Sequence, residues 1–348
     1  MNPYADLLFK GPGHNPGLDG VVARATPELA ERSRAANVPV VNVWMNSAAK
    51  GLPTVLHDVA EAARMTARHL LARGFRDFGY LGLEGLISTQ TQVEAFRSVI
   101  GPLGYTLTEC RVRPRFDYTA DSWQYFQQQL KTWIDGWPSS IGVMVAGDLL
   151  CRYLAEACRE RNLAMPRSVS LVGTGNEIMV ATATTPTLSS VDYGFERIGY
   201  RAAELLDALM DGAPEPAEPL ILAPVSLVAR QSSNAYVVND AMVGSALQFI
   251  SDHLHEDIDV EQVAAHVSTT RRTLSRRFHD SLELTIHDAI TRMRLDRVKS
   301  RLVESSAVLK TIAKECGFRD AIHLCKVFQR VEGTSPSEYR AERRVGDR

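Results

Sequence analysis

A run of arginines near the carboxyl end of the chain has the spacing of a nucleic-acid contact surface. Between Val260 and Phe278, apolar residues recur at the intervals of two short helices joined by a turn. Guanidinium groups bind phosphates and form paired hydrogen bonds with guanine, so arginines on the outer face of the second helix predict contact with one major groove of DNA. The alternative is a basic face that is merely solvated. The outward-facing positions are Arg271, Arg272, Ser275, Arg276 and Arg277.

The same pattern occurs a second time between Leu309 and Phe328. Gly317 ends its first helix at a position suited to the left-handed conformation. Asp320 is predicted to cap the second helix, as Ser268 is in the first copy. Two of the outward-facing residues offer methyl groups that suit thymine, and a helix that contacts phosphates with little base readout is the alternative. The outward-facing residues are Arg319, Ala321, Ile322, His323 and Lys326.

The segment from Ile286 to Val303 joins the two copies and predicts one amphipathic helix, with Thr285 and Asp288 as a capping-box-like start. Roughly eighteen residues at 1.5 Å each span about 27 Å, which can hold two recognition helices about one DNA turn apart. The arginines of this helix are expected to be solvated or salt-bridged rather than bound to DNA. They are Arg294, Arg297 and Arg301.

Residues 258–340 closely resemble the DNA-binding domain of AraC-type transcription regulators. The resemblance implies two helix-turn-helix motifs, sequence-specific binding to double-stranded DNA, a homodimer, and contact with RNA polymerase, with activation as the commoner outcome. The residues that carry it are Arg301-Leu302, Ile312-Ala313, Gly317-Phe318, Phe328, Gly333-Thr334-Ser335-Pro336 and Tyr339-Arg340.

The length and amino-acid composition of the chain are those of a globular protein with two or three domains. The chain has 348 residues, 45% of them apolar, and a net charge of −2. Residues 236–348 carry 18 Lys and Arg against 17 Asp and Glu, so the basic residues of the tail are clustered rather than in excess. Five cysteines without CxxC spacing indicate a reducing, cytoplasmic setting. No apolar run reaches the roughly eighteen residues of a membrane span.

Short apolar runs alternate with helical patterns after an irregular lead-in over residues 1–17. Strands alternating with helices of about ten to fifteen residues predict a parallel α/β sheet. A polar stretch at 231–239 predicts a linker, so the expected domains are 1–230 and 240–348. The predicted strands are 18–24, 38–44, 78–83, 106–112, 141–146, 169–173 and 220–228, and the predicted helices are 27–36, 59–73, 90–100, 121–133, 149–161 and 195–210.

This first part resembles the periplasmic-binding-protein-like sensor of LacI-type regulators, which binds its ligand between two α/β lobes. Joined to the tail, it resembles regulators that fuse a sugar sensor to a DNA-binding domain, which implies a small carbohydrate effector such as a monosaccharide. About seventeen residues precede the first strand, where the family has a strand, a helix and a strand, so we expect an N-terminally incomplete sensor. The carriers are Leu18-Asp-Gly-Val-Val, Val38-Pro-Val-Val, Asp58, Gly74-Phe75, Met144-Val-Ala-Gly-Asp148, Val169-Ser-Leu-Val-Gly173 and Thr185-Pro-Thr-Leu-Ser-Ser-Val191.

Three residues are candidates for ligand binding. Asp148 follows a predicted strand at the edge where α/β clefts bind ligands, and it is predicted either to accept a sugar hydroxyl or to cap the next helix. Asn176 has the same two interpretations. Gln92 stands where the family commonly places an arginine that clamps the sugar, and Gly175 stands where an aspartate is usual. Because a site without a bidentate clamp discriminates hydroxyls less well, the resemblance does not carry xylose over as the effector.

Other chemistry finds no support in the sequence. His253 and His255 lie on opposite faces of a helix, and neither a Walker loop nor a G-x-S-x-G motif is present. We therefore expect no enzyme activity, no cofactor and no metal. The main alternative is a constitutive DNA-binding regulator whose truncated sensor serves as a dimerisation or interaction module. A second is an α/β enzyme with a DNA-binding tail.

Overall fold

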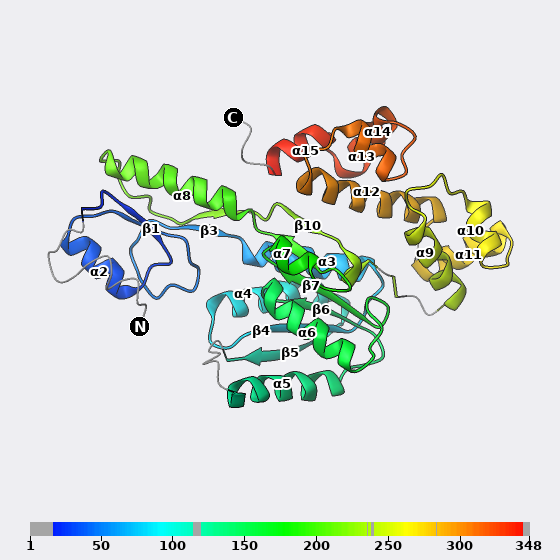
Figure 1. Ribbon diagram of the computed structural model, residues 1–348, viewed down its shortest axis with the longest axis horizontal. Coiled ribbons are helices and arrows are strands. Elements are labelled where there is room, and N and C mark those ends of the chain that lie inside the picture. The colour runs from blue at the N-terminus through cyan, green and yellow to red at the C-terminus, as the bar shows by residue number, and fades with distance from the viewer. Residues whose placement is uncertain (1–16, 114–119, 235, 238–239, 283, 344–348) are drawn as a thin grey trace.

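The computed structural model describes residues 17–113, 120–234, 236–237, 240–282 and 284–343 (Figure 1). The irregular lead-in expected over residues 1–17 lies almost wholly outside them. The described chain forms an α/β region up to residue 234 and a helical region from residue 240. None of the helices in the described part of the chain combines the length and the apolar composition of a membrane-spanning segment.

The large lobe of the α/β region is built on a six-stranded sheet with the order β10-β8-β7-β6-β4-β5. All its neighbours are parallel except β10, which pairs antiparallel with β8 at the edge. Every residue of β6 and β7 is buried, as expected for strands covered on both faces. The predicted parallel sheet is confirmed. Its strands are β4 (Phe78–Leu83), β5 (Leu107–Val112), β6 (Ile141–Val145), β7 (Val169–Thr174), β8 (Ser189–Asp192) and β10 (Ser226–Val228).

Helices cover both faces of this sheet and make two apolar cores. On one face α3 (Val59–Ala72) and α4 (Ile87–Ile100) enclose a core that includes Phe78 and Phe96. On the other, α5 (Ala120–Asp135) and α6 (Asp148–Glu160) enclose a core that includes Leu130. Asp58 caps α3 by accepting a hydrogen bond from the Glu61 amide at 2.8 Å. The short α7 (Ile178–Thr182) follows β7 and was not predicted.

The small lobe lies at the left of Figure 1 and contains β1 (Val21–Ala23), α2 (Pro27–Ala35), β2 (Val40–Asn42) and α8 (Phe195–Met210). Two parallel strands, β3 (Val55–His57) and β9 (Leu220–Leu222), connect it to the large lobe. The prediction of one strand over 220–228 is wrong. Pro224 separates β9 from β10, and the two strands belong to different sheets because the chain crosses between the lobes there.

The helical region repeats one motif on both sides of a central helix. The first helix-turn-helix is α10 (Val260–His266) with α11 (Arg271–Leu282), and the second is α13 (Leu309–Glu315) with α14 (Ala321–Glu332). Helices α9 (Ala241–Asp252) and α15 (Pro336–Arg343) flank the pair. The predicted connecting helix is confirmed as α12 (Ile286–Glu304), whose start Thr285 caps through the Asp288 amide at 3.0 Å.

The two motifs have separate cores that share α12. Ile286, Ile290 and Met293 in its first half pack with the anchors of the first motif. Leu295, Val298 and Leu302 in its second half pack with those of the second motif. Each motif is therefore fixed to a different end of one rigid helix.

The first three residues of the predicted linker pack against the sheet. Residues Gln231–Ser233 form a turn of 3-10 helix, in which Ser232 and Ser233 are fully buried against the sheet. The Ser232 hydroxyl donates to the Leu171 carbonyl at 2.7 Å, and its oxygen accepts from the Ser189 amide at 2.8 Å. Small hydroxyls that pair with strand groups can be buried despite their polarity, which the polar composition of 231–239 did not reveal.

Candidate DNA interface and ligand cleft

The outer face of α11 carries the first candidate DNA contacts. Arg271, Arg272, Ser275 and Arg276 are all exposed, as predicted. Arg271 pairs with Glu261 at 2.8 Å. Within the described chain, Arg272 and Arg276 have no ion-pair partner, so their charges are available to an external anion.

Arg277 does not belong to this face. It is half-buried and donates to Asp240 at 2.7 Å, which ties α11 to the start of α9. The prediction that Ser268 caps this helix is also wrong, because Ser268 lies in the turn between α10 and α11 with φ +52°. Thr270 caps α11 instead, accepting from the Thr273 amide at 3.3 Å.

The second recognition helix, α14, presents a more apolar face. Arg319, Ile322, His323 and Lys326 are exposed, and Ala321 is half-buried at the first position of the helix. Ile322 is 69% exposed, which suits a methyl contact in a groove. Asp320 caps the helix as predicted, accepting from the His323 amide at 2.7 Å.

Two arginines of α12 hold the motifs in place rather than facing DNA. Arg301 pairs with Glu315 of α13 at 2.8 Å, which confirms the salt-bridged interpretation. Arg294 donates to the carbonyls of Leu254 at 3.2 Å and Glu256 at 2.7 Å, in the loop before α10. Gly317, with φ +76°, lies against the same Leu254 carbonyl. The two motifs are thus linked through α12 and through this loop.

A cleft of about 390 Å³ lies between the two lobes, within the usual size of a small-molecule site. Both lobes and the connecting strand β3 line it. The polar and aromatic lining residues are Arg24, Trp44, Asn46, His57, Ser88, Thr89, Gln92, Thr174, Glu177, Tyr193 and Phe195.

Gln92 is the one predicted ligand residue that lies in the cleft. It is 3% exposed and bridges two phenols, accepting from the Tyr80 hydroxyl at 2.6 Å and donating to the Tyr193 oxygen at 2.9 Å. Burial raises the pKa of Tyr193 to about 12, so its hydroxyl stays protonated. Gln92 therefore orients Tyr193 at the cleft wall.

Asp148 does not cap α6, and its carboxylate is engaged inside the large lobe. It is fully buried outside the cleft, and its two oxygens accept from the Ser190 hydroxyl at 2.6 Å and from the Glu177 amide at 2.7 Å. Helix α6 begins at Asp148 itself, after Gly147. Burial raises the pKa of Asp148 to about 6, although both hydrogen bonds oppose this. Its role is to tie α6 to β8 and to the start of α7.

Asn176 is likewise used internally, and it does not line the cleft. Its amide nitrogen donates to Asp192 at 3.0 Å, and its oxygen accepts from Arg230 at 2.6 Å. It also has φ +52°, a conformation that asparagine tolerates better than most residues. Both polar atoms of the Asn176 side chain are therefore engaged inside the large lobe.

Sequence reasoning missed most of the cleft. Arg24 follows β1, Trp44 lies two residues after β2, Thr174 ends β7 and Tyr193 follows β8. The rule that α/β folds bind ligands at the carboxyl ends of their strands would have located all four. Arg24 is exposed, and it has no ion-pair partner among the described residues.

His57 gives the cleft a neutral aromatic floor. Burial, assisted by the Arg24 cation and opposed by Asp58, lowers the pKa of His57 to about 4. The uncharged ring lies 4.1 Å from Tyr193 and 5.5 Å from Phe195, measured between ring centroids. Phe195 is 50% exposed, so a large apolar surface is open in the cleft.

Asn46 connects the lobes at the mouth of the cleft. Its side-chain oxygen accepts from the Ser88 amide at 2.8 Å, and its nitrogen donates to the Ser88 hydroxyl at 3.0 Å. Ser88 lies in the first turn of α4, whose preceding residue Leu86 has no capping side chain. The small lobe thus supplies a helix cap to the large lobe, which stabilises this arrangement of the two lobes.

Two family models match this chain. A periplasmic binding protein-like domain matches residues 67–233, and a helix-turn-helix domain matches residues 263–342. The xylose operon regulatory protein of Haemophilus influenzae is 27% identical over 333 residues, 93% of this chain and 85% of that relative. The arabinose operon regulatory protein of Escherichia coli is 33% identical over 111 residues, 31% of this chain and 38% of that relative.

Solved structures share the fold. The xylose-binding transcription activator XylR aligns with a TM-score of 0.57 at 24% identity, over 94% of this chain and 87% of that one. A LacI family regulator from Enterococcus faecium with bound ribose aligns with a TM-score of 0.53 at 19% identity, over 62% of this chain and 80% of that one. The predicted fold class, a two-lobed α/β domain followed by a helical domain, is confirmed.

Proposed function

We propose that this chain, an AraC-type transcription regulator with a periplasmic-binding-protein-like sensor, activates transcription when a small carbohydrate binds between the lobes of its sensor. The proposal rests on the presence of both parts in one chain. A cleft lined by both lobes precedes two helix-turn-helix motifs whose outer faces are exposed. We place the sensor up to Ser233 and the DNA-binding domain from residue 240.

The cleft has the groups that a sugar requires. Trp44, Tyr193 and Phe195 offer flat apolar surfaces for the C–H face of a sugar ring, and such rings account for much of the binding area in small-molecule sites. Asn46, Thr174 and the Tyr193 hydroxyl supply donors and acceptors for hydroxyls. The relatives are named for xylose and arabinose operons, and one solved neighbour holds ribose, so we propose a pentose as the first class to test.

On the DNA side we assign unequal roles to the two recognition helices. Arg272, Ser275 and Arg276 of α11, with Arg271 beside them, serve as the main phosphate and guanine contacts. Helix α14 adds apolar readout through Ala321 and Ile322, with Arg319, His323 and Lys326 around them. We further propose a cytoplasmic homodimer that contacts RNA polymerase, since two copies can bind two half-sites of one operator.

A titration of the full-length chain tests the sensor. D-xylose, L-arabinose, D-ribose and two hexoses are added while thermal unfolding is followed, with sorbitol as a polyol control. A ligand at 100 times its Kd stabilises a one-site protein by about 2.7 kcal/mol, which is easily measured. The Trp44→Ala variant is expected to lose the response. If no sugar shifts the melting temperature and DNA binding is unchanged by all of them, the chain is a constitutive regulator instead.

A further inference from the structure

Helix α3 runs from the ligand cleft to the DNA-binding domain. Its start adjoins the cleft, where His57 and Val59 are lining residues, and the Asp58 amide donates to the Leu222 carbonyl of β9 at 2.8 Å. The helix has 14 residues, about 21 Å at 1.5 Å each. Any rotation of the lobes about β3 and β9 therefore acts on the first turn of α3, and a rigid helix carries it to the other end.

At that other end, α3 contacts α12 through a buried ion pair. The Nη2 atom of Arg73 lies 3.0 Å from Oδ2 of Asp296, and the Arg73 residue is 4% exposed. Lys299 and Arg73 hold the pKa of Asp296 below its usual range, although burial opposes this. An arginine this deeply buried depends on its carboxylate partner, because without it the charge would be left uncompensated.

A directed chain of hydrogen bonds supports Arg73 from within the sensor. Burial and the adjacent guanidinium lower the pKa of His69 well below its usual value, so the ring is neutral. Guanidinium groups only donate, hence His69 Nδ1 accepts from Arg73 at 2.9 Å and Nε2 donates to the Ser233 hydroxyl at 2.7 Å. Ser233 in turn donates to Ser189 of β8 at 2.7 Å. The position of Arg73 is thus set by the sheet of the sensor.

On the other side of the ion pair, the contact continues to the second recognition helix. Lys299 of α12 lies 3.0 Å from Asp296 and 3.1 Å from Glu332, which is the last residue of α14. Asp296 also sits near the middle of α12, between the two halves that carry the separate motifs. A change at Arg73 therefore reaches the element that sets the positions of both recognition helices.

The chain segment between the domains reinforces this contact. The Val237 amide donates to the Arg73 carbonyl at 2.7 Å, and the Arg73 guanidinium lies 5.9 Å from the centre of the Tyr236 ring. A Cβ on Gly74 would come within 2.2 Å of the Val237 carbonyl oxygen, so the segment crosses the end of α3 at the closest distance that glycine permits. The chain segment that joins the domains and the ion pair between them therefore both contact the carboxyl end of α3.

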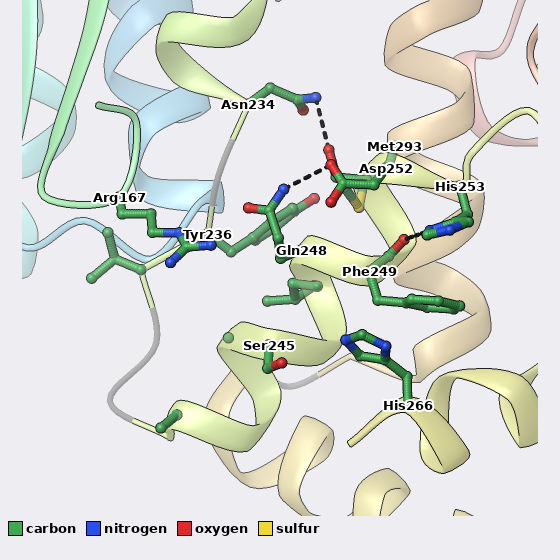
Figure 2. A pocket seen from close by; sticks show the side chains of 15 residues that line it. Arg167, Asn234, Tyr236, Ser245, Gln248, Phe249, Asp252, His253, His266 and Met293 are labelled. Atoms are coloured by element: carbon green, nitrogen blue, oxygen red, sulfur yellow. Dashed lines mark hydrogen bonds between the residues drawn. The ribbon is translucent and has the colours of Figure 1, made fainter. Parts of the chain in front are cut away.

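Beside this contact, the Asn234 side chain donates to the Ser251 hydroxyl of α9 at 3.4 Å. A cavity of about 570 Å³ also lies between the domains, and its lining includes Arg167, Tyr236, and Gln248 and Asp252 of α9 (Figure 2). The exposed faces of α11 and α14 also remain free in this arrangement, so the contact does not cover the DNA-binding surface. Docking through Arg73 therefore positions the DNA-binding domain without blocking it.

We propose that the Arg73–Asp296 contact couples the sensor to the DNA-binding domain, and that α3 transmits closure of the cleft to α12 through it. The coupling rests on the proposed function, since a ligand can control DNA binding only by favouring one of two arrangements. Arg73 and His69 are positioning residues in this scheme and touch neither sugar nor DNA.

The test uses Arg73→Gln, Asp296→Asn and the double variant of the full-length chain. Without any ligand, each variant is expected to show a larger radius of gyration in solution scattering and to unfold its two domains in separate calorimetric transitions. With D-xylose, L-arabinose or D-ribose, whichever shifts the wild type, sugar affinity is expected to stay within twofold. The effect of that sugar on operator affinity is expected to fall below twofold. The double variant should be no worse than either single one.

Arg64→Gln is the matched control, because Arg64 lies on the same helix but pairs with Glu61 inside the sensor. It is expected to keep the wild-type radius, transitions and sugar response. Variants of Arg73 and Asp296 that keep the wild-type radius and full sugar control of operator binding would overturn the coupling. If no sugar acts on the wild type, the carbohydrate proposal fails, while the ligand-free scattering and calorimetry still decide whether the contact docks the domains.

Discussion

Gly317 provides a sharp test of how the two helix-turn-helix motifs are held together. It ends α13 with φ +76°, and a Cβ placed there would lie 2.0 Å from the Leu254 carbonyl oxygen and 2.7 Å from Arg294 Nε. Gly333 ends α14 with the same φ of +76°, but a Cβ there would meet nothing within 4 Å. Gly317→Ala and Gly333→Ala therefore both place a residue with a Cβ in the left-handed conformation. Only Gly317→Ala also brings that Cβ into a clash with neighbouring atoms.

The magnitudes follow from these neighbours. Left-handed backbone costs a residue with a Cβ about 1–2 kcal/mol, which is the whole effect expected for Gly333→Ala. At Gly317 the Leu254 carbonyl must also move, which breaks its hydrogen bond with Arg294. A hydrogen bond to a charged group contributes about 1.5–3 kcal/mol, so with the backbone cost Gly317→Ala is expected to destabilise the DNA-binding domain by about 2.5–5 kcal/mol.

Two optical signals separate the domains in a urea titration. All four tryptophans, Trp44, Trp123, Trp133 and Trp137, lie in the sensor, so their fluorescence follows that domain alone. Helical circular dichroism follows both domains. In the Arg73→Gln background, in which the two domains are expected to unfold separately, Gly317→Ala is expected to move the dichroism midpoint of the DNA-binding domain while the fluorescence midpoint stays in place. It should also weaken binding to a full operator more than binding to the half-site contacted by α11.

Equal destabilisation by the two substitutions, within about 0.5 kcal/mol, would refute this reasoning. It would mean that the loop at Leu254 yields freely, and that Arg294 does not fix the spacing of the motifs.

Three further predictions concern the DNA face and the sensor. Arg272→Ala is expected to weaken operator binding by about 1–3 kcal/mol if it reads a base, or to reduce the salt slope by about one if it contacts phosphate; an unchanged affinity and slope in a salt titration would exclude both roles. For Asp148 the folded pKa of about 6 exceeds the unfolded value of about 3.9, so the stability that this group contributes is fully present below about pH 4 and declines by about 2–3 kcal/mol as pH rises to 6. Asp148→Asn should remove this decline in urea midpoints measured by fluorescence, and an identical pH profile would contradict it. Asn46→Ala removes the cap on α4. Sugar affinity measured by calorimetric titration should therefore fall severalfold, while the stability of the unliganded protein changes by about 1 kcal/mol or less. Unchanged sugar affinity would show that Asn46 does not stabilise closure of the cleft.

The sequence by itself determined the elements whose causes are local. The alternation of strand and helix, the spacing of anchors such as Leu274 and Phe278, and the caps at Asp58, Thr285 and Asp320 depend on neighbours within a few residues. The exposed face of α11 followed from the same periodicity. These features survive folding because tertiary contacts add to them and do not replace them.

Tertiary structure decided which polar residues are available. Asp148 and Asn176 stand at the right edge of the sheet, yet partners 42 and 54 residues away, Ser190 and Arg230, occupy them. Arg24 and Trp44 enter the cleft because the small lobe folds over the carboxyl ends of the large sheet. Arg73 and Asp296, 223 residues apart, become partners only when the domains dock. Such pairings depend on distances between elements, which periodicity along one element does not contain.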